Sequence, residues 1–260
     1  MEYQTIAVSS AGGVARVTLA RPDVRNAFNA QTIAELSAAF GELDGRSDVR
    51  AIVLAGEGKA FCGGADVNWM RASLDLTHER NVADAKAMSA MFRTIDRCSK
   101  PVVARIQGAA LGGGCGLAAV CDVVVAAVDA VFGFTETKLG IVPAVISPFV
   151  LAKIGATNAR ALFLTGERFD ARRAQRIGLV HEVIATVELD TEVERVLDEL
   201  HGASPTAVAV AKRLIVDVGN AQYDATLDLT AEVIAAQRTS EEGQEGLRAF
   251  LERRPASWTK

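Results

Sequence analysis

Two glycine-rich turns carry the strongest chemical signal in this sequence. Gly63-Gly64 follows a strand-like run at residues 50–55, and the glycines at 112–114 follow a second such run at residues 101–106. Glycine lets a backbone approach a ligand closely, and a helix that begins after such a turn points free N–H groups at whatever lies in front of it. Two turns of this kind can hold one carbonyl oxygen between their N–H groups, as in an oxyanion hole. The alternative is that both are tight packing turns.

Glu136 is the acidic residue with the surroundings of a proton-transfer group. It lies in the sequence among Phe132, Phe134, Leu139 and Ile141. Apolar surroundings raise the pKa of a carboxyl group, which suits an acid or base that works near neutral pH. The alternative is an ordinary strand-end glutamate that caps a neighbouring backbone or lies in solvent.

Seven short motifs together resemble the crotonase superfamily, the enoyl-CoA hydratase/isomerase family. They stand in the family's order, span most of the chain and as an ordered set are highly specific. The motifs are Arg21-Pro22, Asn26-Ala27, Lys59–Val67, Gly108–Cys115, Phe132–Glu136, Leu139–Pro143 and Gly178–Val180.

The resemblance implies a site for an acyl-CoA thioester. Glu136 matches the family's catalytic glutamate, and the N–H groups of Ala65 and Gly113 match its oxyanion donors. The other residues that match the coenzyme A and substrate site are Arg25, Ala27, Lys59, Asp66, Val67 and Asn68. For Arg25 and Lys59, which would meet the phosphates, the alternative is that they are ordinary solvated surface cations.

Gly116 is a departure from the family's two-base pattern. Hydratases that use two carboxylates carry a second glutamate at this position, and here it is glycine. We expect hydration of a 2-enoyl-CoA, because residues 142–148 are similar to bacterial hydratases that also lack the second glutamate, some of which act on branched or carboxylated acyl groups. Isomerisation between 3-enoyl-CoA and 2-enoyl-CoA is one alternative. A non-catalytic acyl-CoA-binding protein is the other, although retention of Glu136 argues against it.

No resident cofactor or metal is expected, since coenzyme A would be part of the substrate. The glycines at 112–114 lack the Gly-x-Gly-x-x-Gly order of a dinucleotide site, and Gly58-Lys59 continues with alanine rather than the Ser or Thr of a P-loop. The three histidines have no metal-ligand spacing and are expected at the surface. Cys62, beside the first turn, is expected to be a packed thiol.

Composition limits the remaining classes of function. The chain has 260 residues, half of them hydrophobic, and a formal net charge of −4. This charge gives no support for a nucleic-acid partner, and no apolar run reaches the ~20 residues that a membrane span needs. The four cysteines lack disulfide-framework spacing. Together with an N-terminus that does not have the pattern of a signal peptide, they predict reduced thiols and a cytoplasmic protein.

The elements expected from periodicity give an α/β fold with parallel strand pairing. Strands are expected at residues 2–8, 13–19, 50–55, 101–107, 122–127 and 179–184, and helices at 29–43, 68–98 with a break near 75–79, 147–165, 170–177, 188–201, 205–218, 223–239 and 241–253. The resemblance implies a spiral of ββα units over residues 1–200. It also implies a helical oligomerisation region at 201–260 that forms homotrimers or hexamers.

Overall fold

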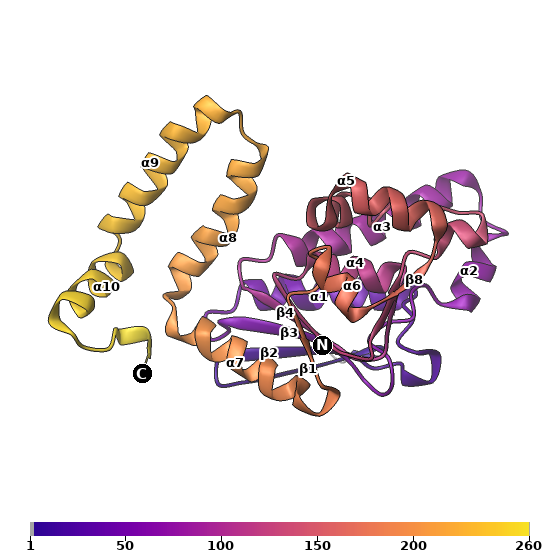
Figure 1. Ribbon diagram of the computed structural model, residues 1–260, viewed down its shortest axis with the longest axis horizontal. Coiled ribbons are helices and arrows are strands. Elements are labelled where there is room, and N and C mark those ends of the chain that lie inside the picture. Colours follow the sequence, from indigo (N-terminus) through magenta and orange to yellow (C-terminus); the bar gives the residue numbers. More distant parts are fainter. Residues whose placement is uncertain (1–2, 260) are drawn as a thin grey trace.

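Two β-sheets form the centre of the molecule. The computed structural model describes residues 3–259 (Figure 1). The strand order of the larger sheet is β1-β2-β3-β4-β6-β9, and that of the smaller is β5-β7-β8. The strands are β1 (Ile6–Ala11), β2 (Val14–Leu19), β3 (Ala51–Gly56), β4 (Val102–Ile106), β5 (Ala109–Leu111), β6 (Val123–Ala127), β7 (Val131–Gly133), β8 (Arg168–Asp170) and β9 (Glu182–Ile184).

The helices match the expected segments closely. They are α1 (Ala30–Asp44), α2 (Val67–Ser73), α3 (His78–Asp96), α4 (Gly113–Val120), α5 (Ser147–Thr165), α6 (Ala171–Arg176), α7 (Leu189–Gly202), α8 (Pro205–Asn220), α9 (Tyr223–Thr239) and α10 (Glu241–Glu252). Short 3-10 helices include η2 (Glu136–Leu139). Asn29 caps α1, with its side-chain oxygen accepting from the Thr32 N–H at 3.0 Å.

The first hairpin begins later than the sequence suggests. Of the strand expected at residues 2–8, only the end from Ile6 is part of β1, and Met1 and Glu2 lie outside the described residues. The N–H groups of Gln4 and Thr5 both donate to the Glu35 carboxylate on α1. Because these donors are used by a side chain, no strand partner pairs with them.

The middle of the chain is a spiral of ββα units, which confirms the expected fold class. In successive turns β4 and then β6 join the larger sheet in parallel, while β5 and then β7 join the smaller one, also in parallel. The preceding turn has the same plan: β3 lies in the larger sheet, and Cys62 forms a single parallel bridge with Ala110 of β5. The sequence did not indicate the smaller sheet, because strands of three residues are too short to show a period.

Helices cover both faces of the larger sheet, which explains its continuous apolar strands. On β3, Ile52 and Leu54 face the main core, which α1 and α3 help to form. Ala51 and Val53 face the opposite way, into a second cluster that includes Leu189, Val193 and Leu197 of α7.

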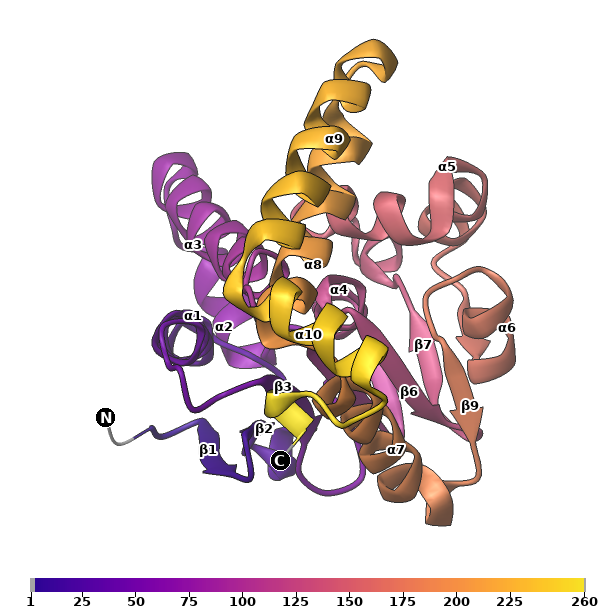
Figure 2. The same cartoon turned by 90° about the vertical axis from the view of Figure 1, so that its left-hand side faces the viewer.

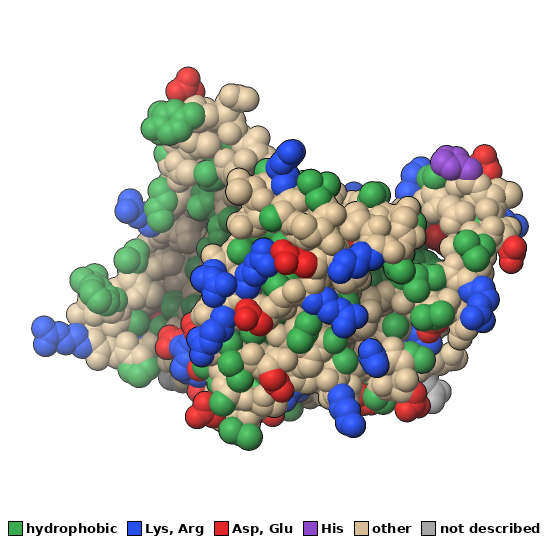
Figure 3. All heavy atoms as spheres, turned by 45° about the vertical axis from the view of Figure 1, so that its right-hand side comes forward, with side chains coloured by type: hydrophobic (Ala, Val, Ile, Leu, Met, Phe, Trp, Pro, Cys, Tyr) green, Lys and Arg blue, Asp and Glu red, His purple; other side chains and the backbone are tan. Residues whose placement is uncertain are grey.

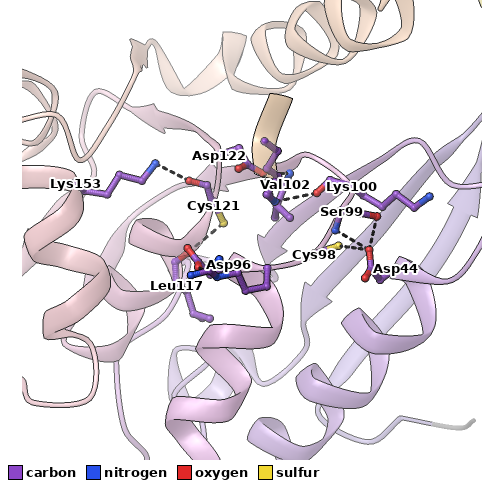
Figure 4. Close-up of polar contacts among 12 residues, drawn as sticks. Asp44, Asp96, Cys98, Ser99, Lys100, Val102, Leu117, Cys121, Asp122 and Lys153 are labelled. Carbon is purple, nitrogen blue, oxygen red and sulfur yellow. Dashed lines mark hydrogen bonds and ion pairs between the residues drawn. The ribbon is translucent and has the colours of Figure 1, made fainter. Parts of the chain in front are cut away.

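A polar junction joins the larger sheet to helix α8. The Asp122 carboxylate accepts from the first N–H of β4, at Val102, at 2.7 Å (Figure 4). It also accepts from the Lys212 ammonium of α8 at 2.7 Å. Lys212 also donates to the Lys100 carbonyl. Nearby, the Asp44 carboxylate accepts from the N–H and hydroxyl of Ser99 (Figure 4). The two bonds from Lys212 tie α8 to the residues at the start of β4 and β6.

Helices α8, α9 and α10, here called the C-terminal arm, extend away from the sheets (Figures 1 and 2). Neither α8 nor α9 has a buried residue, and α10 has only Ala249. Apolar side chains lie exposed on the arm, which is separated from the body by a hollow (Figure 3). They include Ile215, Tyr223, Leu227, Ile234, Phe250 and Leu251. The boundary expected at residues 200–201 falls in the last turn of α7, just before the arm.

No helix between residues 3 and 259 is both long and apolar enough to cross a bilayer. The same residues contain no group of three or more His, Cys, Asp or Glu side chains placed to hold a metal ion.

Candidate active site

The smaller sheet aligns three successive turns of the spiral. Cys62 pairs in parallel with Ala110, and Ala110 pairs in parallel with Phe132. Each of these residues is followed within a few positions by a turn into a helix: α2, α4 and the 3-10 helix η2. Parallel pairing places the three turns at the same edge of the sheet.

The three groups predicted to carry the chemistry occupy these turns. Ala65 stands three residues beyond Cys62, and Gly113 stands three residues beyond Ala110. Glu136 begins η2, just after β7. The two predicted oxyanion donors are therefore in equivalent positions of two successive spiral turns, and Glu136 lies in the next.

The first turn leaves the Ala65 N–H free. Phe28 forms a parallel bridge with Ala65, in which the Phe28 N–H donates to the Gly64 carbonyl at 2.9 Å and the Asp66 N–H donates to the Phe28 carbonyl at 3.0 Å. This pattern uses the residues on either side of Ala65. The Ala65 N–H has no acceptor among residues 3–259, and Ala65 lines a cavity.

The second turn leaves the Gly113 N–H free. Gly112 has φ +51° and ψ −117°, a conformation that requires glycine, and its N–H donates to the Gly133 carbonyl at 2.8 Å. The next N–H, at Gly113, is the first of α4 and has no acceptor in the described part of the chain. Gly113 lines the same cavity as Ala65.

Glu136 faces this cavity from the third turn. A Cβ atom at Gly112 would lie 3.1 Å from its Oε1, so the carboxylate sits beside the second turn. Its Oε2 is buried and has no hydrogen-bond partner among the residues described. Burial raises the pKa of Glu136 above its ordinary 4.5, against a smaller lowering by a hydrogen bond from its own backbone. An unpaired carboxylate with a raised pKa is suited to proton transfer.

The cavity itself is small and mainly apolar. Its volume is about 210 Å³. Besides the three turns, its walls include Phe28, Met70, Met88, Leu139, Ile141, Val142, Pro143, Ala144, Val145 and Ile146. Glu136 is the one ionisable side chain among the lining residues. The site therefore combines two free N–H groups and one carboxylate in an apolar enclosure.

The chain itself fills the space next to Gly116, where two-base hydratases carry a second glutamate. A Cβ atom at Gly116 would lie 2.9 Å from the Phe92 ring and closer still to Ile146 Cγ2, distances that real Cβ atoms do not show. Gly116 is buried. The second carboxylate is thus excluded by packing as well as absent from the sequence.

The predicted coenzyme A residues lie around the first turn. Arg25 and Lys59 are exposed on two loops, and neither appears in an ion pair within residues 3–259. The Arg25 carbonyl accepts from the Gly63 N–H at 2.7 Å, so its loop is fixed against the first turn. Ala27 is buried, and its carbonyl accepts from the Arg21 guanidinium.

The side chain of Asp66 stabilises the fold of the first turn. Its carboxylate pairs with Arg21 at 2.8 Å and caps α2 by accepting from the N–H groups of Asn68 and Trp69. Burial raises the pKa of Asp66, but these hydrogen bonds outweigh it and lower the pKa overall. Only its backbone is left to meet a ligand. Val67 and Asn68 begin α2 with exposed side chains.

Sequence reasoning missed the apolar residues that shape the site. Phe28, Phe92 and Ile146 are buried, and Met70 and Met88 line the cavity. No local signal in the sequence separates them from ordinary core residues, because they reach the site from elements far apart along the chain.

Cys62 is confirmed as a packed thiol, whereas one histidine differs from expectation. Burial raises the pKa of Cys62 to about 12, so it is not a nucleophile at neutral pH. His201 was expected at the surface. It is partly buried, and a Cβ atom at Gly13 would lie 3.4 Å from its Nε2, because α7 packs the ring against the first hairpin.

Comparisons with known proteins identify the family of this chain. The family model described as enoyl-CoA hydratase/isomerase matches residues 9–260. A short-chain-enoyl-CoA hydratase from Clostridium acetobutylicum is 32% identical over 98% of this chain and 97% of its own. The crystal structure of an enoyl-CoA hydratase from Shewanella pealeana has a TM-score of 0.95 at 37% identity, covering 99% of this chain and 97% of that one. For Pseudomonas aeruginosa AtuE the TM-score is 0.96 at 38% identity, with 99% and 100% covered. The chain therefore belongs to the enoyl-CoA hydratase/isomerase family of the crotonase superfamily.

Proposed function

We propose that this protein is an enoyl-CoA hydratase that adds water to a 2-enoyl-CoA with an apolar acyl group. The observation that carries the proposal is the unpaired Glu136 carboxylate, which faces an apolar cavity beside two free backbone N–H groups. The names of the relatives favour hydration within the family's range of reactions.

In the proposed complex the thioester carbonyl oxygen lies between the N–H groups of Ala65 and Gly113. When a nucleophile adds to C3 of the enoyl group, negative charge moves onto this oxygen and an enolate forms. Both donors are fixed by the backbone, so they stabilise the charge without reorganisation. Loss of one such donor typically lowers the rate by ~10²–10³.

Glu136 carries out both proton transfers in this scheme. Its carboxylate takes a proton from water while the water oxygen bonds to C3, and the resulting carboxylic acid then gives that proton to C2 of the enolate. The sum is one water added across the double bond, and Glu136 returns to its starting state. Because one carboxylate serves both carbons from one side, the hydroxyl and the hydrogen add to the same face.

The cavity supports a short apolar acyl group. About 210 Å³ is below the usual size of ligand pockets, and no cationic side chain lines the walls to pair with an acyl carboxylate. The Clostridium acetobutylicum relative is named for short-chain enoyl-CoA. Of the acyl groups considered from the sequence, these features favour an uncharged one.

The nucleotide end of coenzyme A is proposed to lie across the first turn. Arg25 and Lys59 would meet its phosphates, since both are exposed cations on loops next to this turn. Backbone groups of Ala27, Asp66 and Val67 would contact the adenine, with Asn68 beside them at the start of α2.

Isomerisation of a 3-enoyl-CoA to a 2-enoyl-CoA is the second candidate function. The filled space at Gly116 favours it, because a double-bond shift needs only one carboxylate, which removes a proton from C2 and returns it to C4.

A panel of short-chain, branched and carboxylated 2-enoyl- and 3-enoyl-CoAs, with identification of products, tests these alternatives. Formation of a 3-hydroxyacyl-CoA supports hydration. Conversion of the 3-enoyl substrate to a 2-enoyl-CoA, with no 3-hydroxyacyl-CoA formed, supports isomerisation. Binding without turnover of any member would overturn both.

We also propose that the C-terminal arm mediates homo-oligomerisation into trimers or hexamers. Large apolar side chains are exposed on all three of its helices, and exposed apolar patches mark association surfaces. Sedimentation equilibrium should give a mass of three or six chains. A monomer at micromolar concentration would contradict this proposal.

A further inference from the structure

We propose that Phe28 is a positioning residue that sets the separation of the two oxyanion donors. The inference rests on the proposed function, because it concerns the geometry of the same N–H pair. Phe28 is the residue whose backbone and side chain each contact one of the two donor turns.

The backbone of Phe28 fixes the first donor. Its N–H and carbonyl bond to Gly64 and Asp66, the two neighbours of Ala65, at 2.9 and 3.0 Å. In this arrangement Ala65 cannot rotate its peptide without breaking one of these bonds. The direction of the Ala65 N–H is therefore tied to the position of Phe28.

The ring of Phe28 fixes the second donor. A Cβ atom at Gly113 would lie 2.6 Å from ring atom Cε1 and closer still to Cζ. The tip of the ring thus occupies the place where a side chain at Gly113 would stand. The ring therefore blocks movement of Gly113 toward Phe28, whose backbone is bonded to the first turn.

The ring is itself held in place. Phe28 is 1% exposed, and its ring meets Phe92 edge-on, with centroids 6.4 Å apart and planes at 77°. Phe92 in turn packs against Phe149 at 5.9 Å. Buried aromatic rings in such contacts are close-packed and have little room to shift.

Separation matters because both donors must reach one oxygen at 2.7–3.1 Å. A misplacement of about 1 Å at a reacting centre can lower a rate by ~10²-fold. A rigid side chain that keeps the two donors at a fixed separation would therefore raise the rate. The plainer alternative is that Phe28 only fills the core and forms part of the cavity wall, in which case its truncation would change KM rather than kcat.

Phe28→Leu separates these two roles, because it keeps the backbone bonds and removes the ring tip. Phe40→Leu is the matched control: Phe40 is equally buried, on α1, and does not line the cavity. We expect both variants to lose similar stability in urea denaturation. We expect only Phe28→Leu to lose kcat, by ~10- to 10²-fold, with KM for the enoyl-CoA changed less than threefold.

Phe28→Tyr is the second variant, and it lengthens the side chain toward Gly113 where Phe28→Leu shortens it. Its hydroxyl attaches at Cζ, the atom that faces Gly113, so it forces the second turn outward. We expect kcat to fall here too, although the ring and most of its packing remain. This variant keeps the test decisive if Phe28→Leu does not fold.

The outcomes are distinct. If wild type is active and both folded Phe28 variants keep kcat within twofold of Phe40→Leu, the positioning role is wrong and the proposed function stands. If wild type turns over no enoyl-CoA, the proposed function fails and this inference fails with it. A fall in kcat that is confined to the Phe28 variants supports the inference.

Discussion

Two enclosed glutamates in different regions of this molecule have opposite pKa shifts. At the N-terminal strand and helix α1, burial raises the pKa of Glu35, but hydrogen bonds from Gln31, Thr5 and Gln4 outweigh it and lower the pKa to about 2. At the cavity, burial raises the pKa of Glu136, and no other residue described donates to its Oε2. Burial raises the pKa at both sites, and only at Glu35 do side-chain and backbone donors reverse that direction.

The comparison separates a carboxylate that holds the fold from one that can do chemistry. Glu35 accepts from four donors and links α1 to the first residues of the chain. Glu136 has an oxygen free for a water or a substrate hydrogen. Had the cavity supplied donors to Glu136, its pKa would be lower and its carboxylate would be a weaker base for taking a proton from water.

Glu136→Gln should have the largest effect. The amide keeps the shape of the side chain but can neither take nor give the proton, so kcat should fall by ~10²–10⁴. Stability should not fall, because a buried unpaired carboxylate is removed. Assay of the best enoyl-CoA together with a urea denaturation curve checks both statements. Turnover near the wild-type rate would show that the proton is handled elsewhere and would contradict the mechanism.

Gly116→Glu should have the next largest effect, on stability. The new side chain meets Ile146 and Phe92 at once, and overpacking alone costs about 1–3 kcal/mol before a charge is buried. We expect a loss of about 3 kcal/mol or more in urea denaturation. Gly116→Ala is the control for packing without charge, and adding Ile146→Ala to it should recover part of the loss. A Gly116→Glu protein as stable as wild type would show that the space is not filled.

Glu35→Gln should have the opposite effect to Glu136→Gln: it should lower stability and leave kcat unchanged. In the wild type the N–H and hydroxyl of Thr5 donate to one carboxylate oxygen of Glu35. In the variant an amide nitrogen replaces one oxygen, so buried donors lose their acceptor. The expected cost is about 1–3 kcal/mol of unfolding free energy, with kcat unchanged. A loss of turnover in a folded Glu35→Gln protein would break the distinction between the two glutamates.

Long periodic elements and capping residues were predictable from the sequence. Helices α1 and α3 and strands β2, β3, β4 and β6 fall close to the expected ranges, because each shows its period over several turns or pairs. The smaller sheet was not predictable, since β5, β7 and β8 are each three residues long and gain their partners only through the spiral.

The residues of the site also fall into a predictable group and an unpredictable one. The sequence placed Glu136 and the turns at Ala65 and Gly113 through residue types with distinctive chemistry. It could not place Phe28 or Ile146, because an apolar side chain next to a catalytic group looks the same in sequence as one in the core. The contact between Ile146 and Gly116, which closes the second-carboxylate position, exists only in three dimensions.

The smallest expected effect is a difference between the pH at which activity falls and the pH at which stability falls. The folded-state pKa of Glu35 is lowered from 4.5 to about 2, so its contribution to stability is complete above pH 4.5 and is lost as pH falls toward 2. The pKa of Glu136 is raised above 4.5, and its basic form is needed to activate water. Activity should therefore fall at a higher pH than stability does.

An interval just above pH 4.5 should thus contain folded protein with reduced activity. Profiles of kcat/KM and of the urea midpoint in the same buffers measure the two limbs, since kcat/KM reports groups of the free enzyme. Glu35→Gln is the control: it should flatten the acid limb of stability and leave the acid limb of kcat/KM where it is. If the two limbs coincide in wild type and move together in Glu35→Gln, loss of activity follows unfolding, and the raised pKa of Glu136 does not govern the rate.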